Sequence, residues 1–261
     1  MSTVGLLFLV LVFFLTAVIS VVTGGTSLIT VPVMMQFGID PHVAVATNMV
    51  ALIFLSLGGT LPFVKSPVLR PKRLPALIVL TLMGSMLGAF LLLLVPSKAM
   101  PLVIGVAMIV VAVFSIVKPN SGLTESSDSP SRRLEAAGYL ATLLLGVYGG
   151  LFSGGYVALL TAAYVAFFRM TFLEAVAITK VLNVFSSLVA VAIFATEGII
   201  DWKMSLPLSV VSFAGAVVGV IVARKMSNMW LRSMFLTAVI ALAAKTLLYD
   251  VPWSTFIPLL H

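Results

Sequence analysis

Two sets of polar residues interrupt the apolar segments of this chain, and both consist of groups that donate hydrogen bonds. Glycine pairs flanked by hydroxyls occur in TGGTS at 23–27 and in SGG at 153–155. Threonine, asparagine and lysine occur in TNMVA at 47–51 and in TKVLN at 179–183. Backbone N–H groups, hydroxyls, amides and an ammonium all donate to anionic oxygen. If the fold brings these residues together, they predict an anion-binding site.

The glycine pair at 24–25 predicts a break between two helices within a membrane. It follows the apolar run 4–22 and precedes Pro32, and glycine and proline are poor residues for a helix interior. A helix that begins inside a membrane has N–H groups that lipid cannot satisfy, and its dipole places roughly half a positive elementary charge at that end. We therefore expect both helix starts to contact a polar ligand. The residues of the two starts are Thr23, Gly24, Gly25, Thr26 and Ser27 in the first half, and Ser153, Gly154 and Gly155 in the second. The alternative is a tight turn between packed helices, with the hydroxyls capping the second helix.

Lys180 is the most informative polar residue inside the apolar runs. It follows Phe172, the start of its run, by eight residues, which is too deep for its ammonium to reach the membrane surface easily. Buried polar groups of this kind usually face a cavity or a partner, so we expect Lys180 to attract a negative substrate. The residues expected around it are Thr47, Asn48, Thr179 and Asn183. The alternative partner is Glu174, although six residues of separation place it on a different helix face. For Lys245, a position at the outer surface and a position in the pocket both remain open.

The composition identifies an integral membrane protein. Hydrophobic residues make up 61% of the 261 residues, charged residues make up 9%, and the mean hydropathy is +1.24, which excludes a soluble domain with a polar surface. Apolar runs of about twenty residues match helices that cross a hydrocarbon core of roughly 30 Å. The net charge of +7 resides mostly in short loops, so we expect contact with the lipid bilayer and no nucleic-acid binding. Because the chain has no cysteine, disulfides and thiolate metal sites are excluded, and we expect no metal, no cofactor and no catalytic residue.

The order of the apolar runs predicts an all-α fold built from two copies of one unit. The runs lie at 4–22, 27–37, 43–64, 74–95 and 102–117, and again at 134–152, 156–168, 172–195, 204–223 and 230–248. Local patterns recur in the same order: the glycine pairs, ATN at 46–48 with ITK at 178–180, and GSMLG at 84–88 with GAVVG at 215–219. Small residues four apart let helices approach closely.

These runs divide the chain into two repeats within one membrane domain. The first repeat is expected at 1–118 and the second at 134–250, with a polar linker at 119–133 and a tail at 251–261. We interpret the run 4–22 as a retained helix and not as a secretory signal, because no basic residue precedes it.

Loop charges predict that the second copy is inverted relative to the first. Residues 65–73 carry four basic residues, and the linker region carries Lys118, Arg132 and Arg133, so we expect both on the cytoplasmic side. In the second copy the equivalent of the richest loop, 196–203, has one lysine against two acids, and Arg224 and Lys225 follow in the next loop. Inverted-topology repeats, each a broken helix hairpin plus three crossings, give about eight to ten membrane segments with both termini outside the cytoplasm. The charges do not decide whether the hairpins dip into the membrane or span it.

These segments resemble the sulfite exporter TauE/SafE family, a group of bacterial permeases built as duplicated modules. The similar stretches are TGGTSLITVP at 23–32, HVAVATN at 42–48, GGLFSGG at 149–155, EAVAITKVLN at 174–183 and GIIDW at 198–202. The resemblance spans about residues 5 to 248 and implies export of sulfur oxyanions or organosulfonates, such as sulfite or sulfoacetate, across the inner membrane. Two departures concern the pocket. The family often has three adjacent glycines where this chain has two, and Ala162 stands where the repeat predicts a second copy of Pro32.

The sequence therefore predicts a multi-pass permease of the bacterial inner membrane that exports a small anion by alternating access, with the substrate at the paired helix starts near the midplane. The alternatives are an anion channel that uses the same donors, and a permease for another carboxylate or sulfur oxyanion, such as a thiosulfate importer. An intramembrane enzyme is not expected, because the chain has no cysteine, only two histidines and no metal-ligand spacing. A homodimer is compatible with the sequence.

Overall fold

The computed structural model describes residues 3–63, 73–117, 130–223, 237, 240, 241, 244 and 246–251. Within these residues the secondary structure is helical and no strand is present, which confirms the all-α prediction. Several expectations lie outside the described residues: the basic loop at 65–72, the linker at 119–129, most of the last run at 230–248, the residues Arg224, Lys225 and Lys245, and the tail at 252–261.

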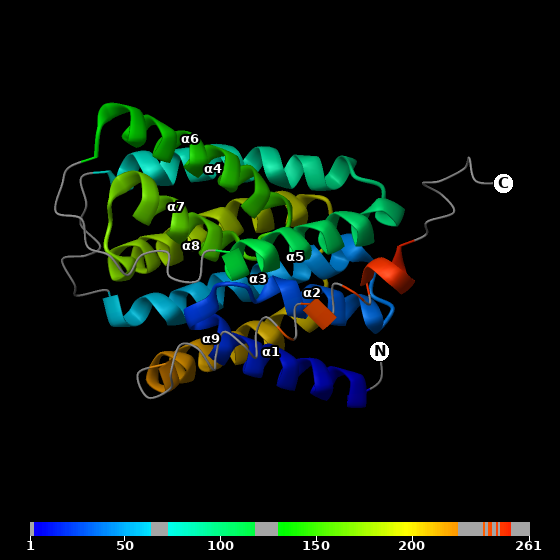
Figure 1. Cartoon of the computed structure of the whole chain (residues 1–261). Coiled ribbons are helices and arrows are strands. Elements are labelled where there is room, and N and C mark those ends of the chain that lie inside the picture. The colour runs from blue at the N-terminus through cyan, green and yellow to red at the C-terminus, as the bar shows by residue number, and fades with distance from the viewer. Residues whose placement is uncertain are drawn as a thin grey trace.

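Each half of the chain begins with a long helix, a short helix and a second long helix (Figure 1). The first half contains α1 (Thr3–Thr23), α2 (Ser27–Gln36), α3 (Pro41–Thr60), α4 (Leu74–Leu94) and α5 (Met100–Val117). The second half contains α6 (Arg132–Leu151), α7 (Tyr156–Phe168), α8 (Phe172–Thr196) and α9 (Trp202–Ala223). Turns of 3-10 helix lie at Leu61–Phe63 and Ser97–Ala99, and a π-helical turn lies at Thr246–Asp250. The helix α6 begins inside the segment expected to be linker, because the Ser131 hydroxyl caps it by accepting from the Leu134 N–H.

The lengths of the helices agree with a multi-pass membrane protein. Five of the described helices, α3, α4, α6, α8 and α9, are long and apolar enough to cross a membrane. In contrast, α2 and α7 have 10 and 13 residues and extend only about 15 and 20 Å at 1.5 Å per residue. Since the hydrocarbon core is about 30 Å thick, neither short helix crosses it alone.

Glycines bring helices of the two halves into close contact. Figure 1 shows α4 beside α6, and α1 beside α9. A Cβ added at Gly84 of α4 would lie 2.5 Å from the Leu143 carbonyl oxygen of α6, and one added at Gly219 of α9 would lie 2.5 Å from the Val18 carbonyl oxygen of α1. Only glycine permits backbones to approach this closely. The close approach expected from GSMLG and GAVVG is thus confirmed at both places.

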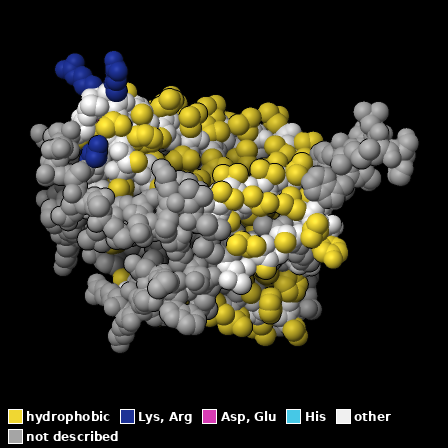
Figure 2. Space-filling model, viewed as in Figure 1, with side chains coloured by type: hydrophobic (Ala, Val, Ile, Leu, Met, Phe, Trp, Pro, Cys, Tyr) yellow, Lys and Arg dark blue, Asp and Glu magenta, His cyan; other side chains and the backbone are white. Residues whose placement is uncertain are grey.

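The helix α3 lies at the centre of the bundle, and α6 lies on its outside. In an 18-residue window, 78% of α3 is buried, whereas 28% of α6 is buried. The helix α3 packs against α8 and α9. Hydrophobic side chains cover much of the described surface over α4 and α6 (Figure 2), as a lipid-facing surface requires. Most polar residues of α3 and α8, among them Asn48, Lys180 and Asn183, are buried inside the bundle.

Candidate anion site

The two helix breaks lie against each other in the middle of the protein. A Cβ added at Gly24 would lie 2.9 Å from the Ala158 backbone nitrogen and 3.2 Å from Val157 Cβ, both in α7. A Cβ added at Gly154 would lie 2.7 Å from Leu28 Cδ2 in α2. Gly24 also has a φ of 72°, in the left-handed region that glycine adopts without strain. The structure therefore brings the TGGTS and SGG segments close to each other.

The hydroxyls at these starts do not act as helix caps. The N-cap residue Thr26 makes no side-chain capping bond, the Ser27 hydroxyl accepts from Asn48 Nδ2 at 2.8 Å, and the Ser153 hydroxyl donates to Asn183 Oδ1. The backbone bonds of α2 begin with the Leu28 N–H, which donates to the Gly25 carbonyl at 3.0 Å. The Ile29 N–H likewise donates to the Thr26 carbonyl, so any N–H group that the start of α2 offers to a ligand lies before Leu28. The alternative in which the hydroxyls simply cap the second helix is wrong for α2.

A small cavity joins both helix starts to Lys180. Its volume is about 10 Å³, which is room for roughly one water molecule. The residues that line it are Ser20, Gly24, Thr26, Ser27, Leu52, Leu55, Ser153, Val157, Lys180 and Asn183. Six of the thirteen residues expected at the site thus share one enclosed space, namely Gly24, Thr26, Ser27, Ser153, Lys180 and Asn183.

The side chain of Lys180 is 1% exposed and lies against Gly59 of α3. A Cβ added at Gly59 would lie 3.3 Å from Lys180 Cδ and 3.7 Å from its Nζ, so the absence of a side chain at Gly59 makes room for the lysine. Neither of the two ion pairs among the described residues includes Lys180.

The alternative partner, Glu174, is used at the start of α8. Its carboxylate accepts from the Thr171 N–H at 2.9 Å, and the Thr171 hydroxyl accepts from the Glu174 N–H at 3.3 Å. These reciprocal bonds form a capping box. The ion pair of Lys180 with Glu174 is therefore not formed, and the buried ammonium takes part in no ion pair within the described part of the chain.

Asn183 and Asn48 hold the two helix starts in place. Asn183 Nδ2 donates to the Ser56 hydroxyl at 2.7 Å, and its Oδ1 accepts from the Ser153 hydroxyl at 3.3 Å. Asn48 Oδ1 accepts from the Thr30 hydroxyl at 2.7 Å, while its Nδ2 reaches Ser27. Asn183 therefore contributes to the wall of the cavity, whereas Asn48 lies behind Ser27 and positions it.

Other residues expected at the site have different neighbours. The Thr47 hydroxyl accepts from the Asp201 N–H at 3.1 Å, and Thr179 bonds the Thr161 hydroxyl at 3.1 Å. Neither lines the cavity, because each points from its helix toward another contact. Gly25, Gly154 and Gly155 form the breaks without lining the cavity. Nothing is described for the side chain of Thr23.

Three lining or supporting residues were missed by sequence reasoning. Ser20 is fully buried, lines the cavity, and has a hydroxyl with no hydrogen-bond partner among the described residues. The sequence feature that could have identified Ser20 is its position about one helical turn before Gly24. Ser56 lies eight residues after Asn48, on the same helix face. No sequence pattern identifies Gly59 as a site residue, because its contact with Lys180 depends on how α3 crosses α8.

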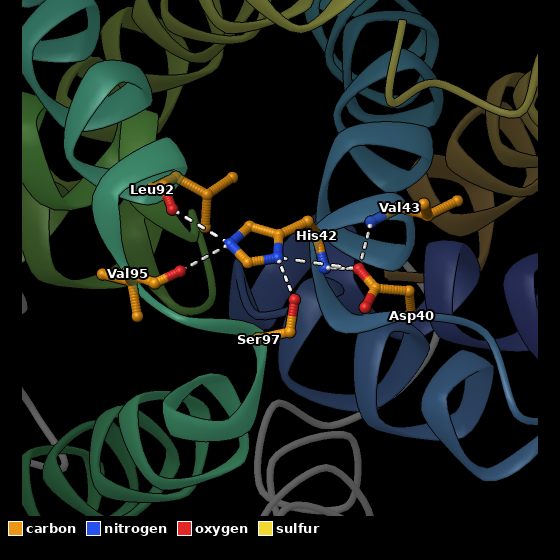
Figure 3. Close-up of polar contacts among 6 residues, drawn as sticks. All are labelled: Asp40, His42, Val43, Leu92, Val95 and Ser97. Atoms are coloured by element: carbon orange, nitrogen blue, oxygen red, sulfur yellow. Dashed lines mark hydrogen bonds and ion pairs between the residues drawn. The ribbon is translucent and has the colours of Figure 1, made fainter. Parts of the chain in front are cut away.

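A second polar cluster surrounds His42, the second residue of α3, and it fastens the corner between α4 and α5 (Figure 3). His42 Nε2 lies 3.1 Å from the Leu92 carbonyl oxygen and 2.9 Å from that of Val95. Because both are acceptors, Nε2 carries the proton. Ser97 Oγ, at 2.9 Å, and Asp40 Oδ1, at 3.6 Å, both face Nδ1. A serine hydrolase needs its serine and aspartate on opposite ring nitrogens, whereas here both face Nδ1. The cluster therefore holds the start of α3 against the corner between α4 and α5 and does not have the arrangement of a catalytic triad.

Comparison with known proteins agrees with this architecture. The family model described as "Sulfite exporter TauE/SafE" matches residues 9–246. The "Probable membrane transporter protein ORF9" of Sinorhizobium sp is 29% identical over 82% of this chain and 81% of that protein. The "Probable membrane transporter protein YfcA" of Escherichia coli (strain K12) is 26% identical over 94% and 90%, and a "Probable membrane transporter protein" of Haemophilus influenzae is 25% identical over 93% and 94%. No solved structure matches. The apolar helices and these relatives support a multi-pass membrane permease, and the chain belongs to the sulfite exporter TauE/SafE family.

Proposed function

We propose that this protein exports sulfite or small organosulfonates across the bacterial inner membrane by alternating access, and that the anion binds between Lys180 and the starts of α2 and α7. The observation that carries the proposal is the burial of Lys180, which is 1% exposed and in no ion pair among the described residues, in the cavity that both helix starts line. Both termini are proposed to lie outside the cytoplasm, as the loop charges indicate.

An anion would remove the cost of burying the lysine. A charge inside a membrane protein is expensive and usually meets a counter-charge or a polar cavity. Lys180 lines the cavity and forms no ion pair within the described part of the chain, so we propose that its counter-charge comes from outside the protein. A substrate anion supplies it, and the proposal therefore explains why a lysine occupies this depth.

The charge at the cavity fits a small anion with one or two negative charges. The ammonium contributes one positive charge, and each helix start contributes roughly half of one. Hydroxyls of Ser20, Thr26 and Ser153 line the same space and can donate to several oxygens of one ligand. Sulfite and sulfonates carry three oxygens around one sulfur, so several donors can bind at once. The family's name, sulfite exporter, supports the same class of substrate, namely sulfur oxyanions.

The size of the cavity favours a carrier over a channel. A volume of about 10 Å³ holds roughly one water molecule, so an oxyanion can bind only if the walls move. Alternating access requires such a movement, and the two short helices α2 and α7 are the walls that carry the helix starts. A channel with the same donors, a permease for a carboxylate, and a thiosulfate importer remain alternatives that use the same site.

Flux in proteoliposomes tests the proposal. Vesicles that contain the full chain are loaded with ³⁵S-sulfite, and efflux is measured with and without sulfite outside. We expect saturable efflux that external sulfite accelerates, and a large loss of flux in Lys180→Gln. Lys203→Gln, at the exposed start of α9, is the matched control and should transport normally. Conductive flux without exchange would indicate a channel, and normal exchange in correctly folded Lys180→Gln would contradict the assigned site.

A further inference from the structure

We propose that the outer surface between α4 and α6 binds an anionic phospholipid, with its phosphate at Arg132 and Arg133 and an acyl chain in the groove below them. The site is separate from the cavity at Lys180 and does not depend on which anion the protein carries.

The groove is apolar and lies on the outside of the bundle. Its volume is about 470 Å³, and its lining consists of Pro75, Ala76, Val79, Leu80 and Tyr139. Val79 is 54% exposed, and Met83, Met86 and Leu87 farther along α4 are exposed as well. An apolar groove offers water few hydrogen-bond partners, so its hydration is unfavourable. In a membrane, an acyl chain is the natural occupant.

A rigid polar end closes the groove where α4 and α6 begin. Arg73, which precedes α4, donates from Nε to Glu135 Oε1 of α6 at 2.6 Å, and its guanidinium carbon lies 5.6 Å from the centre of the Phe168 ring. Tyr139 packs edge-on against the same ring, at 5.3 Å between ring centres. These contacts fix the groove wall and neutralise Glu135, which is the acid nearest to this end in sequence.

Two arginines remain available beside this closed end. Arg132 and Arg133 are exposed, and neither takes part in an ion pair among the described residues. Figure 2 shows Lys and Arg side chains projecting at the end of the molecule where α6 begins in Figure 1, next to the hydrophobic surface. Positive charge at the first residues of α6, together with the apolar groove between α4 and α6, matches the layout of an anionic lipid, whose phosphate lies above its acyl chains.

The spacing along α6 fits one lipid molecule. Arg132 precedes Tyr139 by seven residues, which is about two helical turns on one face and roughly 10 Å along the axis. Arginines bind phosphate with paired hydrogen bonds. The acyl chain of a lipid whose phosphate they hold would therefore run past Tyr139 and along Val79. Tyrosine at this level is typical of the membrane interface.

A second copy of the chain fits this surface less well. A stable protein interface buries about 1,200 to 2,000 Å² in total, and a twofold dimer across this groove would place Arg132 and Arg133 near their symmetry mates. The repulsion between four arginines would oppose such a dimer. The same arginines attract a phosphate, so the positive charge favours an anionic lipid over a second copy of the chain as the occupant of this surface.

Native mass spectrometry of the full chain tests the proposal with two lipids of equal acyl length, phosphatidylglycerol and phosphatidylcholine. The wild-type protein should retain phosphatidylglycerol preferentially. Arg132→Gln with Arg133→Gln should reduce that preference by about twenty-five-fold, since each arginine near anionic lipid contributes about a factor of five. Val79→Trp, which fills the groove, should reduce the retention of both lipids. Lys203→Gln and Val210→Trp, at exposed positions of α9, are the matched controls and should behave as wild type.

The outcomes separate the lipid from other occupants. Equal retention of the two lipids by wild type, or an unchanged preference in the double arginine variant, would overturn the proposal. A shift from dimer to monomer in Val79→Trp without loss of bound lipid would also overturn it, because the groove would then be a subunit interface. Loss of sulfite transport in Lys180→Gln with lipid retention intact would leave this site supported, since the two sites are separate.

Discussion

Asn183 and Ser56 are joined by a hydrogen bond of 2.7 Å, in which the Asn183 amide of α8 donates to the Ser56 hydroxyl of α3. The same amide accepts from the Ser153 hydroxyl at the start of α7. One side chain beside Lys180 thus connects three helices. An anion that draws donors from Ser153 or Asn183 would weaken this connection. We therefore expect substrate binding to loosen the start of α7 from α8, which links binding to movement of a short helix.

Asn183→Ala should lower both stability and affinity. The substitution leaves the Ser56 and Ser153 hydroxyls without their buried partner, and an unsatisfied buried group costs about 1 to 3 kcal/mol. We expect a lower thermal midpoint of the detergent-purified protein and a weaker stabilisation by sulfite. Ser209→Ala is the control, because the buried Ser209 hydroxyl has no partner among the described residues. Equal thermal midpoints for Asn183→Ala and Ser209→Ala would show that the Asn183 bonds contribute nothing.

Gly59→Ala should impair the site more than the fold. The added Cβ would lie 3.3 Å from Lys180 Cδ, so the flexible lysine has to shift away from its present position. Overpacking of this kind costs about 1 to 3 kcal/mol, and we expect sulfite affinity to fall by about fivefold or more, measured by titration of thermal stability.

The neighbouring glycine provides the control for that prediction. A Cβ at Gly58 would lie 2.9 Å from the Phe213 carbonyl oxygen of α9, which is backbone and cannot move easily. Gly58→Ala should therefore lower the thermal midpoint strongly while the remaining folded protein binds sulfite with normal affinity. The reverse pattern in the two variants would contradict the assigned contact between Gly59 and Lys180.

Ser20→Ala should weaken binding without destabilising the unliganded protein. The Ser20 hydroxyl is buried, lines the cavity and has no hydrogen-bond partner among the described residues, so its removal breaks no bond within that part of the chain. If the hydroxyl donates to the anion, its loss should cost about 1 kcal/mol or more of binding free energy.

Ser187→Ala separates that effect from simple removal of a buried hydroxyl. Ser187 is fully buried and also lacks a partner in the described part of the chain, but it does not line the cavity. We expect wild-type sulfite affinity for Ser187→Ala in isothermal titration calorimetry. Similar affinities in the two variants would remove Ser20 from the site.

The sequence predicts the helices well because their ends are set by local chemistry. The run 156–168 coincides with α7 (Tyr156–Phe168), and the run 27–37 differs from α2 (Ser27–Gln36) by one residue. At these places glycines and loop residues end the helix whatever the tertiary contacts are. Helix bounds therefore follow from residues that are close in the chain.

The partners of individual side chains depend on how the helices cross, which no pattern along the chain specifies. Thr47 and Thr179 occupy equivalent positions in the two predicted copies, yet Thr47 bonds the backbone of Asp201 and Thr179 bonds Thr161. The contact between Gly59 and Lys180 joins residues far apart in the sequence for the same reason. Periodicity predicts which face of a helix is buried, but it does not predict what lies opposite that face.

The inversion that the loop charges predict for the second half can be tested by where the two ends of the chain lie. The starts of α4 and α6 are at one end of the bundle, because Arg73 and Glu135 form an ion pair there, and the basic residues of both segments favour the cytoplasm for that end. Reporters fused after Val117 and after His261 should consequently report opposite sides, with the fusion after Val117 in the cytoplasm. Alkaline phosphatase, which is active only outside the cytoplasm, and green fluorescent protein, which fluoresces inside, measure the two positions independently. If both fusions report the same side, the second half is not inverted, and the helix starts of α2 and α7 do not approach from opposite membrane faces.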